Sequence, residues 1–219
     1  MNFSQLQGLV SYWLDDLNFG YFTQTQVQLW LNNAQVEVQK MLINSGQCRY
    51  NYWVGTTLIV GQSDYVLPAD FRKLQNLEIV LSGTPPNEAV NPIVPITTNQ
   101  KYLIPMGQAT PSVYRFRKNR LVIQPAPDTP LLMRLEYTYL ISNMVNATDI
   151  PDIPTEYHEL IALLAAADGF IKDGRQNALL LTKIEAYQQD LLSDAQDRNQ
   201  DMPRGIVQTG DSTGGEMYW

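Results

Sequence analysis

The chain has 219 residues, of which 44% are hydrophobic and 17% are charged, and its formal net charge is −7. These values are typical of a globular protein with one sizeable core or two smaller ones. The sequence contains no apolar run of about 18 residues and no recognisable signal peptide, so we expect no membrane partner. The single cysteine, Cys48, excludes an internal disulfide and a cysteine-based metal cluster, and it favours synthesis in a reducing cytoplasm.

The negative charge is concentrated near the C-terminus. Residues 1–150 carry ten basic and ten acidic side chains, whereas residues 151–219 carry five basic and twelve acidic ones. An acidic segment repels nucleic acid, so specific nucleic-acid binding is not expected.

Two helices are predicted at the N-terminal end. Apolar residues recur at helical spacing over residues 3–17, and an Asn-Phe-Gly sequence follows them. Thr23 and Gln26 have the spacing of a capping box for a second helix, which should end at Ser45-Gly46. We expect the two helices to form an antiparallel pair.

From Tyr50 to about Ser142 the apolar period changes to two, which predicts β-strands. Residues 56–67 have the pattern of a hairpin, and "YRFRKNRLVIQP" predicts a second one that turns at Lys118-Asn119. Many prolines stand near strand ends, as in a small antiparallel sandwich with blunted edges.

Between the strands of residues 65–80, "YVLPADFRKLQNLEIV", lies a corner stiffened by Pro68. We expect this corner to join two strands that change direction and to bury Leu67 and Phe71.

Helical spacing returns after residue 150. One helix should begin at Pro154-Thr155 and break at Asp173-Gly174, and a second should follow it as a helical hairpin. The sequence therefore predicts an α+β fold. It consists of a four-helix bundle (1–48 and 150–198), an inserted antiparallel β-sandwich or barrel-like domain (49–149), and an extended C-terminal tail (199–219) that docks on a partner.

The sequence offers little for catalysis. Its single histidine, His158, lies near Asp149, Asp152, Glu156 and Glu159, which suggests either a cation site or a solvated helix start. No nucleotide-binding or hydrolase motif occurs. We therefore expect no catalytic residue, no metal site and no cofactor.

Two groups of side chains are candidates for partner binding. Cations crowd the tip of the "YRFRKNR" hairpin, namely Arg115, Arg117, Lys118 and Arg120. This tip is either a solvated turn or an inter-subunit or tail contact, whose acidic neighbour could be residues 151–219 of another copy. The tail carries apolar side chains that we expect to bind a partner, namely Ile206, Val207, Met217, Tyr218 and Trp219.

Several sequence segments, spread over about residues 24–198, resemble the head-to-tail adaptor (connector) proteins of short-tailed bacteriophages. They are "WLNNAQVEVQKML", "YVLPADFRKLQNLEIV", "PSVYRFRKNRLVIQPAP", "LEYTYL" and "DIPDIPTEYHELIALLAAADGF". The resemblance implies a non-enzymatic virion protein that forms a ring, typically dodecameric, at the portal vertex between capsid and tail. It also implies that the tail segment reaches the portal protein, that a tail or nozzle protein follows, and that DNA passes through the channel without specific binding.

Two alternatives remain. One is a tail-associated binding module, in which the β-sandwich recognises carbohydrate or protein through Tyr50, Tyr52, Trp53 and Tyr102. The other is an enzyme centred on His158, which predicts that His158→Ala abolishes an activity.

Overall fold

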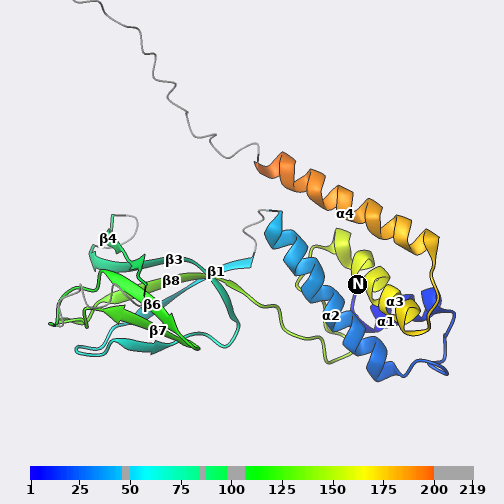
Figure 1. Cartoon of the computed structure of the whole chain (residues 1–219), viewed down its shortest axis with the longest axis horizontal. Helices are drawn as coiled ribbons and strands as arrows, with labels where there is room; N and C mark the ends of the chain where they lie inside the picture. Colours follow the sequence, from blue (N-terminus) through cyan, green and yellow to red (C-terminus); the bar gives the residue numbers. More distant parts are fainter. Residues whose placement is uncertain (46–49, 84–86, 98–106, 200–219) are drawn as a thin grey trace, which may run out of the picture.

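A computed structural model of the chain describes residues 1–45, 50–83, 87–97 and 107–199, with side chains up to Ser193. The fold mixes α and β structure, as predicted. Figure 1 shows a β-rich part and a helical part side by side, with the last helix lying along the helical part. Within the described residues, no helix is both long and apolar enough to cross a bilayer.

The helical part is made from both ends of the described chain. Its elements are α1 (Phe3–Leu14), α2 (Gln24–Asn44), the short 3-10 turn η3 (Thr155–Tyr157), α3 (His158–Lys172) and α4 (Ala178–Asn199). The predicted capping box of α2 is confirmed, because Thr23 and Gln26 each accept a hydrogen bond from the other's backbone N–H.

The first helix ends earlier than predicted. Asp15 takes the left-handed conformation with φ 56°, which ends α1 at Leu14. The carboxylate of Asp16 then accepts hydrogen bonds from the backbone N–H groups of the next turn, those of Gly20, Tyr21 and Phe22. These bonds hold the loop to α2 in place and hold the pKa of Asp16 below its usual value.

Helix α3 is the centre of the helical part, since it packs against α1, α2 and α4. At Gly169 of α3 the backbone comes so close to α1 that an added Cβ would lie 2.7 Å from Leu14 Cδ2. Helix α4 packs mainly against α3, so the complete four-helix bundle stays a prediction.

The β part contains two four-stranded sheets. The first sheet has the order β1 (Asn51–Thr57), β8 (Leu132–Tyr139), β3 (Phe71–Ser82), β4 (Ala89–Pro92); the second has the order β2 (Asp64–Val66), β7 (Arg120–Gln124), β6 (Val113–Arg117), β5 (Val94–Pro95). The pairings are antiparallel except for β5 with β6, which is parallel. The two sheets share one apolar core and do not close into a barrel within the described residues.

The predicted hairpin over residues 56–67 is wrong. Strand β1 pairs with β8 in the first sheet, whereas β2 pairs with β7 in the second. The alternation of side chains identified both strands, but a period of two does not reveal which strand is the partner.

The corner at Pro68 is confirmed as a change of direction. It carries the chain from β2 in the second sheet to β3 in the first, and the Phe71 N–H donates to the Pro68 carbonyl at 3.1 Å. Leu67 is buried and Phe71 is partly buried against the β core.

The buried residues form two clusters. One fills the helical part and the other fills the space between the two sheets. Tyr139, at the end of β8, packs against both clusters, and its carbonyl accepts a hydrogen bond from Gln39 of α2 at 2.7 Å. These contacts fix the junction between the two parts.

Candidate functional site

The predicted hairpin turn at Lys118-Asn119 is confirmed. Strands β6 and β7 pair up to Arg117 opposite Arg120, and Lys118 has φ 55°, which a tight two-residue turn requires.

Alternation along these strands sorts the side chains of the hairpin. Tyr114 and Leu121 pack in the β core, and Phe116, which is 45% exposed, lies on the same face and contacts the rings of Phe71 and Tyr114. Arg115, Arg117 and Arg120 therefore share the outer face of the second sheet. Together with Lys118 they form the surface that we call the basic tip.

The cations of the basic tip differ in their surroundings. Arg120 pairs with Asp64 of β2 at 2.9 Å, and Arg115 is partly buried with an unpartnered Nε. Arg117 and Lys118 are exposed, and within the described residues neither side chain makes a hydrogen bond or an ion pair. Two cations of the tip are therefore free to meet an anionic group.

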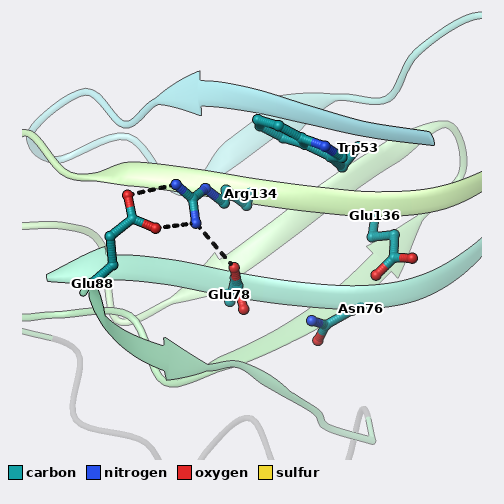
Figure 2. Close-up of a pocket in the computed structure, with 6 residues that line it drawn as sticks. All are labelled: Trp53, Asn76, Glu78, Glu88, Arg134 and Glu136. Atoms are coloured by element: carbon teal, nitrogen blue, oxygen red, sulfur yellow. Dashed lines mark hydrogen bonds and ion pairs between the residues drawn. The ribbon is translucent and has the colours of Figure 1, made fainter. Parts of the chain in front are cut away.

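A pocket of about 420 Å³ lies on the outer face of the first sheet (Figure 2). We call it the Trp53 pocket, and it is lined by Trp53, Asn76, Glu78, Glu88, Arg134 and Glu136. The register explains the grouping. Trp53 of β1 and Asn76 of β3 both lie opposite Glu136 of β8, and Glu78 lies opposite Arg134.

Arg134 occupies one end of the pocket. Its guanidinium donates to Glu88 at 2.6 Å, lies 3.7 Å from Glu78, and sits 5.6 Å from the centre of the Trp53 ring. The hydrogen bond to Glu88 raises the pKa of Arg134 further, so its positive charge is permanent. These contacts hold the side chains of Arg134, Glu78 and Glu88 in place, as Figure 2 shows.

At the other end of the pocket lies the carboxylate of Glu136. Figure 2 shows Glu136 beside Asn76, away from the network around Arg134. Glu136 makes no hydrogen bond or ion pair in the described part of the chain, and the Trp53 side chain above it is 62% exposed. An unpaired carboxylate next to an exposed indole can receive a cation or a polar ligand.

Sequence reasoning did not find this pocket. The alternation over residues 132–139 correctly placed Arg134 and Glu136 on one wet face, but Trp53 and Glu78 reach them only through long-range strand pairing. Nothing in the local sequence identifies those partners.

The expectation of a solvated His158 is wrong, since the side chain is only 1% exposed. Its Nε2 donates to the Ile153 carbonyl at 2.9 Å, and its Nδ1 lies 2.6 Å from the α-amino nitrogen of Met1. Burial lowers the pKa of His158, so the ring is neutral and accepts from the amino group.

The carboxylates near His158 have other partners. Asp149 accepts from the N–H groups of Val145 and Asn146, and Glu159 accepts from Tyr187 and Lys183. Asp152 accepts from the hydroxyl of Tyr139. No group of three possible metal ligands occurs in the described residues, so the geometry does not support a cation site there.

The aromatic residues of the carbohydrate hypothesis are distributed unequally. Tyr50 is buried and donates to the Asp152 carbonyl, whereas Tyr52 and Trp53 are more than half exposed. Tyr102 and Cys48 lie outside the described residues, as do the predicted partner-binding residues of the tail, Ile206, Val207, Met217, Tyr218 and Trp219.

A family model described as SU10 adaptor protein matches residues 1–209. No curated protein matches the chain.

Proposed function

The chain belongs to the SU10 adaptor protein family, and we propose that it forms a ring, dodecameric in symmetry, that joins the portal to the tail of a bacteriophage virion. A structural adaptor role in the virion follows from the family itself. The ring, its position at the portal vertex and its continuation of the DNA channel are the proposed part. The observation that carries the proposal is the match over residues 1–209, which includes both the helical and the β part.

The division of the chain supports this role. We propose that residues 1–48 and 150–198 act as one four-helix body, that residues 49–149 act as an inserted β domain, and that residues 199–219 form an extended segment. The separate helical and β cores support the first two units. An adaptor needs such separate surfaces, because it contacts different proteins above, below and beside it.

Three protein partners are proposed. The tail segment binds the portal protein through its apolar residues, which lie outside the described part: Ile206, Val207, Met217, Tyr218 and Trp219. The β domain faces a tail or nozzle protein or a neighbouring copy, and the exposed side chains of Arg117 and Lys118, which have no partner in the described part of the chain, support that contact.

DNA is proposed to pass the ring without specific binding. The excess of acidic side chains over residues 151–219 supports this, since it repels phosphate. We expect no catalytic activity and no cofactor, because the family is structural and the carboxylates around His158 have structural partners.

Reconstitution tests the proposal. The purified chain is mixed with purified portal rings of the same virus, and the mass of the complex is measured by sedimentation. We expect a discrete complex with as many copies of the chain as of the portal subunit. Failure to bind portal rings under any salt condition would overturn the proposal.

A second candidate function is a tail-associated module that recognises carbohydrate or protein. It is favoured by one observation, the exposed Trp53 beside Asn76 and Glu136, because sugars stack on indole rings and bond to carboxylates and amides. Binding to a glycan array that is lost in Trp53→Ala, without binding to portal rings, would select this function instead.

A further inference from the structure

We propose that the basic tip of one copy of this chain docks into the Trp53 pocket of a second copy. The inference rests on the proposed function, which requires copies to associate, and it assigns the two surfaces that meet. The sequence alone pointed to the acidic residues 151–219 as the receiving surface. The structure offers a better-formed receptor on the β domain itself.

The two surfaces lie on opposite sides of one sandwich. Arg115 and Arg117 alternate with Tyr114, which packs in the core, and with Phe116, which lies opposite buried Leu121, so they point outward from the second sheet. Glu136 alternates with buried Leu135 and Tyr137, so it points outward from the first sheet. Because the two inner faces meet in one core, the two outer faces point away from each other.

Opposite placement has a consequence for assembly. A surface that binds a different surface of the next copy makes a head-to-tail contact, which repeats from copy to copy and closes when the rotation between copies fits a ring. Each β domain can thus insert its basic tip into one neighbouring copy and receive the basic tip of another copy in its Trp53 pocket.

The pocket has the chemistry of a cation receptor. It holds three carboxylates and one guanidinium, and Arg134 pairs with Glu78 and Glu88 and lies near the Trp53 ring. The carboxylate of Glu136 is left without a partner in the described residues. An arriving guanidinium can bond to Glu136 and stack on the exposed indole of Trp53, a combination that favours arginine over lysine.

The basic tip has a matching donor. Arg120 is already paired with Asp64, but Arg117 and Lys118 have no partner in the described residues and stand at the end of a hairpin stiffened by strand pairing. We assign Arg117 to the Glu136 end of the pocket. Lys118 is then placed near its rim.

The acidic helices are a weaker receptor. Glu159 is already bonded to Lys183 and Tyr187, and the carboxylates of Glu185 and Asp190 are exposed on α4. Isolated ion pairs in solvent contribute little to binding. The Trp53 pocket is therefore the surface that the geometry favours.

Charge reversal tests the pairing in the full-length chain. Arg117→Glu and Glu136→Arg are each expected to weaken the association of copies on portal rings by about tenfold, as like charges meet. Combining both substitutions in one chain is expected to restore most of the association. Glu185→Arg, which makes the same charge change on α4, is the matched control and is expected to leave association unchanged.

A cross-link gives a second measurement that does not depend on charge reversal. In a chain with Cys48→Ser, the pair Arg117→Cys and Glu136→Cys should form disulfide-linked ladders of copies on portal rings, and either cysteine alone should give dimers at most. Thermal unfolding of each variant shows that it folds.

The outcomes separate the two proposals. If wild-type chains assemble on portal rings but the double reversal does not restore association and no ladder forms, the pairing is wrong and the adaptor role stands. If Glu185→Arg weakens association as strongly as Glu136→Arg, the tip docks on the acidic helices instead. If wild-type chains do not assemble on portal rings at all, the proposed function fails, and the pairing fails with it.

Discussion

Arg117 and Glu136 lie on opposite outer faces of one β-sandwich, and within the described residues neither side chain has a hydrogen-bond or ion-pair partner. Unpaired groups of opposite charge on opposite faces are what a repeating contact between identical subunits needs. The helical part, by contrast, satisfies most of its internal polar groups: Gln39 bonds to Tyr139, and His158 bonds to Ile153.

Reversal of the basic tip should weaken contacts between copies. We expect Arg115→Glu with Arg117→Glu to reduce assembly on portal rings most clearly at low ionic strength, where charge interactions are least screened. Sedimentation across a salt series measures the effect. Lys40→Glu with Lys73→Glu changes the net charge equally at two exposed lysines that make no ion pair within the described ranges, and it should not weaken assembly. If both double variants assemble equally at every salt concentration, the basic tip does not contribute to contacts between copies.

Removal of residues 199–219 should separate folding from attachment. Both cores lie within residues 1–191, so the truncated chain is expected to unfold at nearly the wild-type temperature. Its stable binding to portal rings should be lost, because the apolar tail residues are the proposed portal contact. Calorimetry and co-sedimentation check the two halves of this prediction, and unchanged co-sedimentation would contradict it.

The substitution His158→Ala should destabilise the protein without removing a chemical activity. It leaves the buried carbonyl of Ile153 without its donor and removes the acceptor of the Met1 amino group. We expect a loss of about 1–3 kcal/mol in the free energy of unfolding, measured by urea titration. Assembly on portal rings below the unfolding transition should persist. A stable variant that fails to assemble would point to a direct role for the imidazole.

Stability should fall when the pH drops through the range in which an exposed histidine titrates. The pKa of His158 is lowered below 6.5 by burial, with Met1 and Glu156 as the nearest charges that act on it. The unfolded chain takes up a proton near pH 6.5 while the folded chain does not, so stability present above this pH is lost below it.

The comparison of wild type with His158→Gln isolates this effect. Between about pH 7.5 and 5.5 the wild type should lose more stability than the variant, which has no imidazole to protonate. The lowered pKa values of Asp149 and Glu159 act in the same direction but below about pH 4.5. Parallel curves for the two proteins in the upper range would contradict the buried, neutral state of His158.

Alanine substitutions at two helical glycines, Gly169 and Gly8, should change the free energy of unfolding in opposite directions. An added Cβ at Gly169 meets Leu14 at 2.7 Å and Trp30 at 3.3 Å, so Gly169→Ala should cost more in overpacking than it gains in helix propensity. We expect a net loss of about 1 kcal/mol. Gly8→Ala meets no atom within 4 Å and should stabilise α1 by about 0.5–1 kcal/mol. Thermal unfolding of both variants decides the matter.

Local patterns in the sequence predicted the individual elements well. Thr23 and Gln26 identified the start of α2, and Lys118-Asn119 identified the turn of the β6–β7 hairpin. These features depend on residues a few positions apart, and side-chain chemistry decides them locally.

Contacts between residues that are far apart in the sequence could not be predicted from such local patterns. The pairing of β1 with β8 joins residues about 80 positions apart, and it alone brings Trp53 to Glu136. The buried His158 likewise meets the amino group of Met1, which lies 157 positions away in the sequence. A helix start rich in carboxylates resembles a solvated one until its tertiary partners are known.

The copy number of this chain in purified virus particles tests the adaptor role most directly. Quantitative mass spectrometry of the particles gives the ratio of the chain to the portal protein. The adaptor role predicts equal copies of the two proteins, as in two matched rings. A many-fold excess over the portal protein, or absence of the chain from the particle, would contradict it.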